Sequence, residues 1–425
     1  MSSLKYKFKM YVGNLAINTS VHICKRKDNG FLGKLIFAVY QEMLHIANMS
    51  VFPVVSANKY QEITGNAEET VIETNRMGVS GNIIMAGSNE ETVLETSPLP
   101  DLKLYKYSNV NITGNSDIVV DLINKYVISE EAYDCDDNLE IIDGLLYRSS
   151  QNICLLRENF RHRKDEISCG IMISGKFCNN YYHLLYENLN RLISIENANI
   201  PLSVPIIIDK KTQEIPSCKR IIDILKGSKR PVVTITSDKI YKVSVLYNLN
   251  HIHHLPSHLK DIHRPSVVLY NKENLLKQRK MLLAYKSLSE FPKRIFLSRS
   301  NTKRRRFNED EVFDILKKYG FERLAPENYS FEEQMAIFNN AEYIVSGSGA
   351  ALSNLLFVNK CCIVICFGIS TYDDQCEIPV FNTIANVNES RFLYFPRKTN
   401  SKGNIHVNFE IDCEDFAKVV KSIIR

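Results

Sequence analysis

The sequence predicts an α/β protein built on a mostly parallel sheet, and two observations support this prediction. Apolar strand patterns alternate with helix patterns from Ile167 onward, as in strands joined by crossover helices. In the C-terminal half this alternation is regular enough to indicate a doubly wound sheet. Ligands of such sheets bind at the carboxyl ends of the strands, so the residues that follow each strand are the first site candidates.

The first hundred residues carry weaker signals and are expected to form an extra α+β segment. A helix is expected near Phe31–Asn48 and a strand over Val51–Val55. Polar residues interrupt the apolar pattern of this helix, which therefore predicts an amphipathic helix of a globular protein. Alternation with turn residues from Leu102 to Ser129 predicts several β-strands. The expected domain boundaries are 1–100, 101–270, 271–400 and 401–425.

The middle of the chain alternates buried-type strands with helical spacing. Strands are expected at Gly170–Ser174, Pro205–Asp209, Val232–Thr236 and Lys242–Leu246. Helices are expected at Asn180–Ile195 and Lys219–Leu225, where apolar residues recur every three or four positions.

The C-terminal half repeats strand and helix at short intervals. Strands are expected at Arg294–Ser298, Phe321–Leu324, Tyr343–Val345, Cys362–Phe367 and His406–Ile411. Asn308 with Glu311, and Ser330 with Glu333, have the spacing of capping boxes that begin helices. Further helices are expected over Ala350–Phe357 and Glu414–Ile424.

Composition is that of an ordinary globular protein. The chain has 425 residues, 44% hydrophobic and 24% charged, with a net charge of +5. This mild charge does not predict a nucleic-acid partner. The N-terminus lacks the apolar core of a signal peptide, and the 11 cysteines include no C-x-x-C pair. We therefore expect a reduced, cytoplasmic setting, compatible with peripheral association at the inner face of a membrane.

A short apolar strand runs directly into small residues at Ser346-Gly347-Ser348-Gly349-Ala350. Small residues let the backbone approach a ligand closely, and the first turn of a following helix offers unpaired N–H groups. This geometry suits a diphosphate or another anion. A tight strand-to-helix turn that binds nothing is the alternative.

A basic run follows the strand that ends near Ser298. Seven positive residues lie between Lys293 and Arg306, and the next acid is Glu309. The run predicts a solvated loop, a nuclear signal, a nucleic-acid patch or a clamp for a diphosphate. Because it follows a strand end in a doubly wound unit, and because guanidinium forks match phosphate oxygens, the clamp is favoured. Arg299 is its first candidate.

Histidines supply the candidates for acid–base chemistry. His183 and Glu187 are four residues apart and share one helix face, so they predict either a general base with its orienting carboxylate or a partly buried structural pair. A cluster of five histidines predicts a loop more than a metal site, because Pro256 breaks any helix. These histidines are His251, His253, His254, His258 and His263. Asp134-Cys135-Asp136 has the D-x-D pattern of some metal-binding sugar transferases, a pattern common by chance.

Three sequence blocks together resemble glycosyltransferase family 61, in particular its bacterial relatives of capsular polysaccharide synthesis. The first block is Asn180-Tyr181-Tyr182-His183 with Glu187 and Arg191. The second is Leu297-Ser298-Arg299 with Arg305-Arg306-Phe307-Asn308-Glu309. The third is Phe331–Gln334 with Val345–Phe357. The similarity covers roughly residues 167–367.

The resemblance implies a GT-B-like architecture: two Rossmann-like doubly wound domains, here with the extra N-terminal segment. It also implies inversion at the anomeric carbon without an essential metal or other cofactor. The chain departs from the family at Ser348, where many members have histidine before Gly-Ala. Serine can still donate a hydrogen bond to phosphate, but it cannot carry a positive charge.

The sequence thus predicts a glycosyltransferase that moves a hexosyl, pentosyl or N-acetylhexosaminyl group from a nucleotide sugar, expected to be UDP-linked, to an oligosaccharide or polysaccharide. His183 is the expected base, oriented by Glu187. Asn354 is expected to bond the sugar or ribose, or to brace the turn. The expected nucleotide-sugar site consists of Arg299, Arg304, Arg305, Arg306, Ser348, Gly349, Ala350, Ser353 and Asn354.

Three alternatives stay open. The chain could bind a nucleotide or sugar without catalysis, or bind nucleic acid through residues 303–306 with strong salt dependence. It could also be a metal-dependent transferase, whose activity EDTA would abolish.

Overall fold

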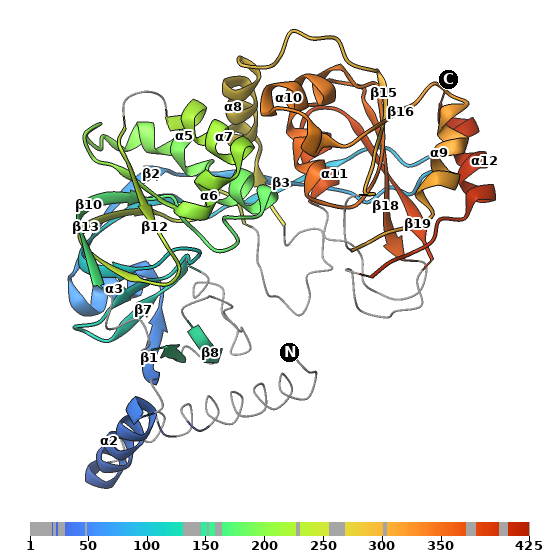
Figure 1. Ribbon diagram of the computed structural model, residues 1–425. Helices are drawn as coiled ribbons and strands as arrows, with labels where there is room; N and C mark the ends of the chain where they lie inside the picture. Colours follow the sequence, from blue (N-terminus) through green and yellow to red (C-terminus); the bar gives the residue numbers. More distant parts are fainter. Residues whose placement is uncertain are drawn as a thin grey trace.

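The computed structural model describes residues 30–46, 49–130, 146–150, 153–157, 164–226, 230–254, 268–300, 304–370, 380–398 and 407–424, besides Thr19 and Ile23. Within these ranges the protein is an α/β structure of two lobes, with helix α8 (Lys272–Leu283) between them (Figure 1). No helix in the described ranges is both long and apolar enough to cross a membrane. Asp134, Asp136, Lys303, His258 and His263 lie outside the described residues.

The N-terminal lobe contains an eleven-stranded mixed sheet in the order β12-β11-β10-β13-β5-β6-β7-β1-β9-β8, with β2 paired to β5. Its strands are β1 (Met49–Val55), β2 (Ala67–Glu73), β5 (Leu102–Ile112), β6 (Val119–Asp121), β7 (Tyr126–Ile128), β8 (Leu146–Ser150), β9 (Ile153–Arg157), β10 (Lys164–Met172), β11 (Ile206–Asp209), β12 (Val232–Ile235) and β13 (Ile240–Leu249). Neighbours β12, β11, β10 and β13 are parallel, as the sequence predicts, whereas β5 joins β13 in antiparallel register. Strands β1 and β2, which fall in the predicted N-terminal segment, are hydrogen-bonded into this same sheet.

Most helices of this lobe connect the parallel strands along the chain. They are α2 (Gly30–Ile46), α3 (Ala57–Thr64), α4 (Tyr181–His183), the π-helix η2 (Leu184–Asn188), α5 (Arg191–Ile195), the 3₁₀-helix η3 (Glu196–Ala198), α6 (Lys210–Glu214) and α7 (Pro216–Lys226). The single helix predicted over Asn180–Ile195 is therefore interrupted. Leu189 N–H bonds the carbonyl of Leu184, five residues back, so the middle of this segment is wound more widely than an α-helix.

Helix α2 confirms the helix predicted near Phe31–Asn48, but one part of its apolar surface is exposed. Leu35, Ile36, Val39 and Met43 are between 42% and 63% exposed. Leu44 is buried against Val51 and Leu155 of the sheet edge. The helix is thus amphipathic, and only its inner side contributes to the described core.

The C-terminal lobe contains a five-stranded sheet in the order β16-β15-β17-β18-β19, and every pair is parallel. Its strands are β15 (Arg294–Leu297), β16 (Glu322–Leu324), β17 (Tyr343–Gly347), β18 (Ile363–Ser370) and β19 (Arg391–Arg397). Its helices are α9 (Glu309–Lys317), the 3₁₀-helices η5 (Pro326–Asn328) and η6 (Ala350–Phe357), α10 (Phe331–Asn340), α11 (Phe381–Val387) and α12 (Cys413–Ile423). This is the doubly wound pattern that the sequence predicts, extended by α11 and β19. A three-stranded sheet of β3 (Met77–Gly81), β4 (Leu94–Pro98) and β14 (Tyr270–Asn271) lies beside α11 and α8.

Alternating residues of the strands divide the core into separate layers. In β15, Ile295 and Leu297 belong to the largest hydrophobic cluster, while Phe296 belongs to a second cluster with helices α9 and α12. Ile171 of strand β10, in the other lobe, also belongs to the largest cluster. Period-2 side-chain alternation explains this division. One core therefore connects the two lobes through a face of each sheet.

Three local expectations are corrected. Asn308 begins α9 and its side chain bonds that of Glu311, but it makes no capping hydrogen bond to the helix backbone, because its amide also bonds the backbone of Ile411. Ser330 does form the predicted capping box with Glu333. Residues 407–411 form an isolated bridge at Glu410 rather than the predicted strand, and His406 lies outside the described residues. The Ala350–Phe357 helix is 3₁₀ rather than α.

Candidate active site

The site begins where the order of the C-terminal sheet reverses. The chain leaves β15 toward β16 on one side, and later inserts β17 on the other side of β15. The loops after β15 and β17 therefore diverge from one edge, and the region between their first residues, called the crevice below, is the position at which doubly wound proteins bind ligands. Ser298-Arg299 follows β15, and Ser348-Gly349 follows β17. Both segments were predicted as site candidates, and the topology brings them together.

Two arginines converge on one carbonyl oxygen in this crevice. Arg299 Nη1 lies 3.0 Å from the Ser348 oxygen, and Arg305 Nη1 lies 3.1 Å from the same atom. The pKa of Arg299 is lowered, first by burial and second by the charge of Arg305. Two guanidinium groups that share so small a region repel each other, so the crevice favours an anion.

Glycine at position 349 leaves room for the Arg299 guanidinium. A Cβ atom at Gly349 would lie 2.0 Å from Arg299 Nη1, and one at Gly347 would lie 3.0 Å from Arg299 Cδ. Gly349 has extended backbone, with φ of 172°, so the requirement concerns space rather than conformation. The small-residue turn therefore lets an arginine lie directly over the backbone, close to the N-terminus of η6.

Glu309 holds the start of the loop that carries Arg299. Its carboxylate accepts a hydrogen bond from Ser298 Oγ at 2.6 Å and another from the Arg299 backbone N–H at 2.9 Å. Glu309 belongs to the second sequence block but is not among the predicted site residues. Its position immediately after a predicted N-cap was the available signal, since an acid there can bond nearby backbone N–H groups.

The other two predicted arginines, Arg304 and Arg306, are more exposed than Arg305. The side chains of Arg304 and Arg306 are exposed, and the Arg306 backbone pairs with residues 408 and 409. Arg305 has φ of 56°, and this left-handed conformation gives it a different direction from its neighbours. Arg305 is thus the member of this run with a described hydrogen bond at the crevice.

The first turn of η6 supplies backbone donors. Its first intrahelical bond runs from Leu352 N–H to the Gly349 carbonyl, so the Ala350 and Ala351 N–H groups precede this ladder. Ala350 is exposed and Ser348 is buried. Backbone amides and arginine side chains thus surround the same end of the β17 turn.

Ser353 and Asn354 are buried beneath the turn. Asn354 is 1% exposed; its side-chain oxygen accepts from Tyr181 Oη at 2.6 Å, and its nitrogen donates to Gln334 at 3.0 Å. Asn354 therefore braces the turn, the second of its two predicted roles. Ser353 is fully buried, and its carbonyl accepts from Tyr186 Oη at 2.6 Å. Tyr181 and Gln334 were not predicted as supports.

His183 and Glu187 form the predicted pair. His183 Nδ1 lies 2.8 Å from Glu187 Oε1, and their side chains are 27% and 19% exposed. An ionised carboxylate only accepts, so it holds the proton on Nδ1 and leaves the Nε2 lone pair available. The His183 ring packs against Phe177 and Tyr182. This arrangement gives an oriented imidazole at the carboxyl end of β10.

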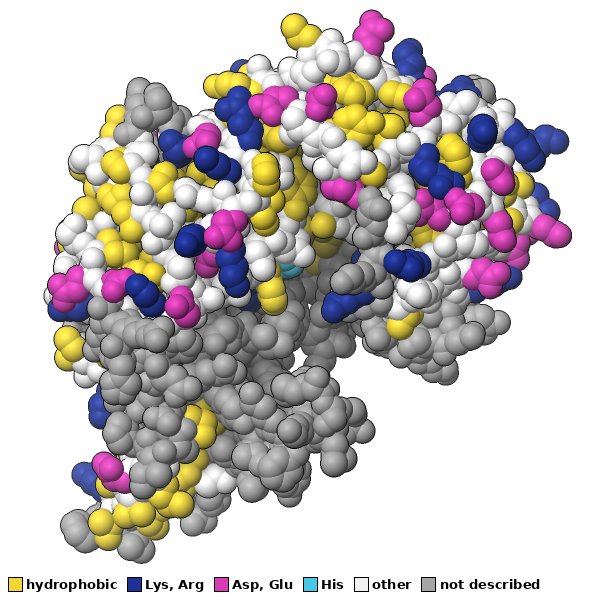
Figure 2. Space-filling model, viewed as in Figure 1, with side chains coloured by type: hydrophobic (Ala, Val, Ile, Leu, Met, Phe, Trp, Pro, Cys, Tyr) yellow, Lys and Arg dark blue, Asp and Glu magenta, His cyan; other side chains and the backbone are white. Residues whose placement is uncertain are grey.

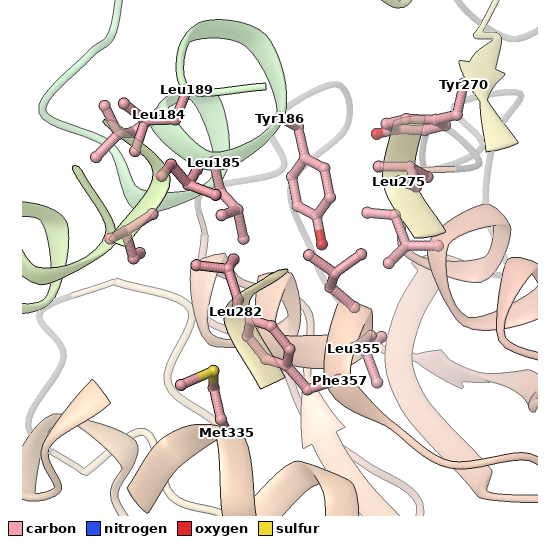
Figure 3. Packing of buried hydrophobic residues seen from close by; sticks show 14 of the residues in the cluster. Leu184, Leu185, Tyr186, Leu189, Tyr270, Leu275, Leu282, Met335, Leu355 and Phe357 are labelled. Carbon is pink, nitrogen blue, oxygen red and sulfur yellow. The ribbon is translucent and has the colours of Figure 1, made fainter. Parts of the chain in front are cut away.

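Tyrosines join the two halves of the site. Tyr181 and Tyr186, which flank His183 on the same segment, bond Asn354 and Ser353 of η6. Figure 3 shows Tyr186 pointing its hydroxyl toward η6, among leucines from both lobes. On the face shown in Figure 2, the surface is hollowed between the lobes and a histidine is visible there. The segment carrying His183 thus packs on the helix that follows the anion crevice.

No metal cluster is apparent within the described ranges, where no three His, Cys, Asp or Glu side chains are placed to share an ion. His251, His253 and His254 lie in the loop after β13, as predicted. A hollow of about 520 Å³ lies beside Arg391 at the start of β19, at the opposite edge of the C-terminal sheet from the arginine crevice.

A doubly wound sheet with two convergent arginines at its switch point, packed against the segment that carries an oriented histidine, is typical of enzymes that act on phosphorylated or nucleotide-linked substrates. Comparison with known proteins narrows this class. Residues 181–365, which include both halves of the site, match the family model described as Glycosyltransferase 61.

A curated protein of Drosophila melanogaster, "EGF domain-specific O-linked N-acetylglucosamine transferase", is 27% identical over 158 residues. The match covers 33% of this chain and 29% of that protein, so the chain spans less than a third of the relative's length. Both matches support a glycosyltransferase.

Proposed function

We propose that this protein transfers a sugar from a nucleotide sugar to a hydroxyl of a glycan, with inversion at the anomeric carbon and without an essential metal. The observation that carries the proposal is the convergence of Arg299 and Arg305 on Ser348 at the sheet's switch point. Positive side chains there can neutralise a departing diphosphate, the role that a metal has in other transferases.

The proposed reaction is a single in-line displacement. The acceptor oxygen forms a bond to the anomeric carbon while the bond from that carbon to the diphosphate oxygen breaks. The acceptor proton passes to His183 Nε2, and Glu187 stabilises the imidazolium through Nδ1–H. The electron pair of the broken bond stays on the nucleoside diphosphate, whose charge Arg299, Arg305 and the first N–H groups of η6 stabilise.

The architecture is proposed to be GT-B-like, with the C-terminal sheet holding the donor and the N-terminal lobe presenting the base. The proposed donor is UDP-linked, and the proposed acceptor is a polysaccharide, as in capsule synthesis. The relative's name adds the N-acetylglucosamine group to the sugars worth testing in the donor. Free thiols at all eight described cysteines support the proposed cytoplasmic setting.

A thermal-shift panel of nucleoside diphosphates and nucleotide sugars, with Mg²⁺ or with EDTA, tests the donor site. We expect one nucleobase to raise the melting temperature, equally in both conditions. Arg299→Ala should abolish this shift and lower transfer by about 10²-fold or more, because one preorganised charge contact is lost. Arg304→Ala, an exposed arginine of the same run, is the matched control and should retain both.

The alternatives give different results. Nucleotide binding without turnover over a broad acceptor panel would indicate a non-catalytic binder. Activity lost in EDTA would contradict the metal-independent mechanism. Normal transfer by a folded Arg299→Ala protein would remove the proposed clamp.

A further inference from the structure

Helix α2 carries an apolar stripe that the described part of the chain leaves exposed. The stripe consists of Leu35, Ile36, Val39 and Met43. The outer side of a helix that packs on a globular core is ordinarily polar. In Figure 2, hydrophobic side chains form a strip at the lower left, where Figure 1 places α2. An apolar surface of this kind indicates an interaction site.

Helical geometry places the four side chains of the stripe together. Leu35, Val39 and Met43 recur at intervals of four residues, and Ile36 lies beside them. Successive residues of an α-helix are rotated by about 100°, so the four fall within an arc of about 100° over roughly two turns. The exposed charged residues between positions 34 and 44 fall outside this arc. The stripe is therefore continuous and uncharged.

Another side of α2 holds the helix on the sheet. Leu44 is buried against Val51 of β1 and Leu155 of β9, and Tyr40 packs against the same cluster. These contacts fix the rotation of the helix about its own axis. The stripe is therefore presented outward by the packing of the inner side, and a partner can bind it without rearranging this cluster.

Basic residues are concentrated in the same part of the chain. Residues 1–34 contain six lysines and one arginine but only one acid. Their net charge is +6, against +5 for the whole chain, so the remaining residues are close to neutral together. Lys25, Arg26 and Lys27 come three to five residues before Gly30, where α2 begins. Chain connectivity alone keeps them within about 20 Å of that residue.

An apolar stripe next to a basic segment matches the surface of an anionic membrane. Apolar side chains of such a helix enter the boundary between headgroups and acyl chains, while lysine and arginine attract the negative headgroups. The strength of binding increases with both the apolar area that is buried and the attraction to anionic lipids. Both contributions are present within the first 43 residues of this chain.

A second copy of the chain fits the stripe less well. Two stripes packed on each other would bring together two segments of net charge +6, and like charges oppose such a contact. A bilayer that contains anionic lipids instead offers the opposite charge beside an apolar interior. Charge complementarity therefore favours the membrane as the occupant.

We propose that the protein binds the surface of an anionic membrane, with the stripe of α2 inserted at the headgroup boundary and the basic residues before α2 beside the lipid phosphates. The inference goes beyond the proposed sugar transfer and does not depend on it. Figure 1 shows α2 at the end of the N-terminal lobe, apart from the C-terminal lobe. The membrane surface and the arginine crevice therefore do not overlap.

Vesicle flotation of the full chain, without nucleotide, tests the proposal. One set of vesicles contains phosphatidylcholine alone, and the other contains phosphatidylcholine mixed with phosphatidylglycerol. We expect the protein to bind the mixed vesicles about tenfold more tightly or better, because only these carry net negative charge. Added salt should weaken this binding by screening the headgroup charge.

Val39→Asp combined with Met43→Asp should lower binding to the mixed vesicles about tenfold or more, because the stripe is then no longer apolar. Both side chains are more than half exposed, so the fold should persist, which thermal melts check. Leu202→Asp combined with Leu288→Asp makes the same charge change at exposed leucines outside α2 and is the matched control. Val39→Ser combined with Met43→Ser adds no charge and should lower binding by a smaller factor.

Lys25→Gln, Arg26→Gln and Lys27→Gln combined should lower binding to the mixed vesicles about tenfold or more and leave binding to phosphatidylcholine unchanged. Absence of wild-type binding to the mixed vesicles overturns the proposal. Equal binding by the two double aspartate variants also overturns it. Dimers in sedimentation velocity that the Val39→Asp and Met43→Asp variant loses would assign the stripe to a second copy, which likewise overturns it.

Discussion

At the scale of single residues, the site depends on where a side chain is missing as much as on where charges are present. Arg299 can lie over the β17 turn because Gly347 and Gly349 have no Cβ to obstruct it. The Ser348 carbonyl then accepts hydrogen bonds from both Arg299 and Arg305. The Gly-Ala pair of the motif is therefore explained in part by the arginine that it accommodates.

Gly349→Ala is expected to disturb binding more than folding. The new Cβ displaces the Arg299 guanidinium, so nucleotide affinity should fall about tenfold, the loss of one charge-assisted hydrogen bond. Gly320→Ala is a control that should lower stability and leave nucleotide affinity unchanged. The φ of 77° at Gly320 strains alanine by about 1 kcal/mol, and Gly320 is remote from the crevice. Calorimetric titration with the shifting nucleotide and thermal melts of both variants measure this contrast. Equal affinities in the two variants would contradict it.

Glu130 gives a pH dependence of stability. Burial raises its pKa to about 7 in the folded protein, from an ordinary 4.5, although Arg191 and Lys103 oppose this shift. The unfolded chain therefore ionises first as pH rises, and the folded state loses stability between about pH 4.5 and pH 7. Glu130→Gln removes this loss.

The variant Glu130→Gln should therefore be more stable than wild type at pH 8, by about 3 kcal/mol, and should melt like wild type at pH 4.5. Thermal melts across this range measure the difference. A melting difference that is independent of pH would show that the Glu130 pKa is not raised on folding.

At the scale of elements, two helix starts with similar sequences behave differently. Ser330 caps α10 through the predicted box, whereas Asn308 bonds both the N–H and the carbonyl of Ile411. The Asn308 side chain thus acts like a strand partner for the segment that leads into α12. Local spacing could predict the first arrangement, but the second depends on a residue about a hundred positions away.

Asn308→Ala should loosen α12. It leaves the backbone groups of Ile411, which is 1% exposed, without these partners, at a cost of about 1–3 kcal/mol. Hydrogen exchange should accelerate in residues 413–423. Ser330→Ala, expected to cost about 1 kcal/mol, should leave exchange in α12 unchanged. Similar α12 protection in both variants would show that Asn308 does not anchor the segment.

At the scale of the whole molecule, the two lobes share one core. The largest hydrophobic cluster contains strand residues from both sheets together with residues of α5, α8 and η6. Figure 3 shows Leu282 of α8 and Leu355 of η6 in this cluster. Tyr181 and Tyr186 add hydrogen bonds across the same boundary. Separation of the lobes would expose this cluster, so they are expected to unfold together.

Leu355→Ala tests this expectation. Leu355 is fully buried in η6, and its truncation should cost about 2–5 kcal/mol. Scanning calorimetry should show one transition in wild type, displaced as a whole in the variant. Tyr186→Phe, which loses one hydrogen bond, should displace it less. Two wild-type transitions, of which Leu355→Ala moves only one, would mean that the lobes fold separately.

Sequence alone determined the α/β class and the C-terminal strand and helix order, and it named Arg299, Arg305 and the His183–Glu187 pair among its site candidates. These follow from short-range regularities, namely apolar periodicity, capping signals and charge after a strand. Tertiary structure decided the antiparallel pairing of β5 with β13 and the bracing of Asn354 by Tyr181. Those contacts join residues more than a hundred positions apart, and they depend on strand pairing and core packing, which no local pattern encodes.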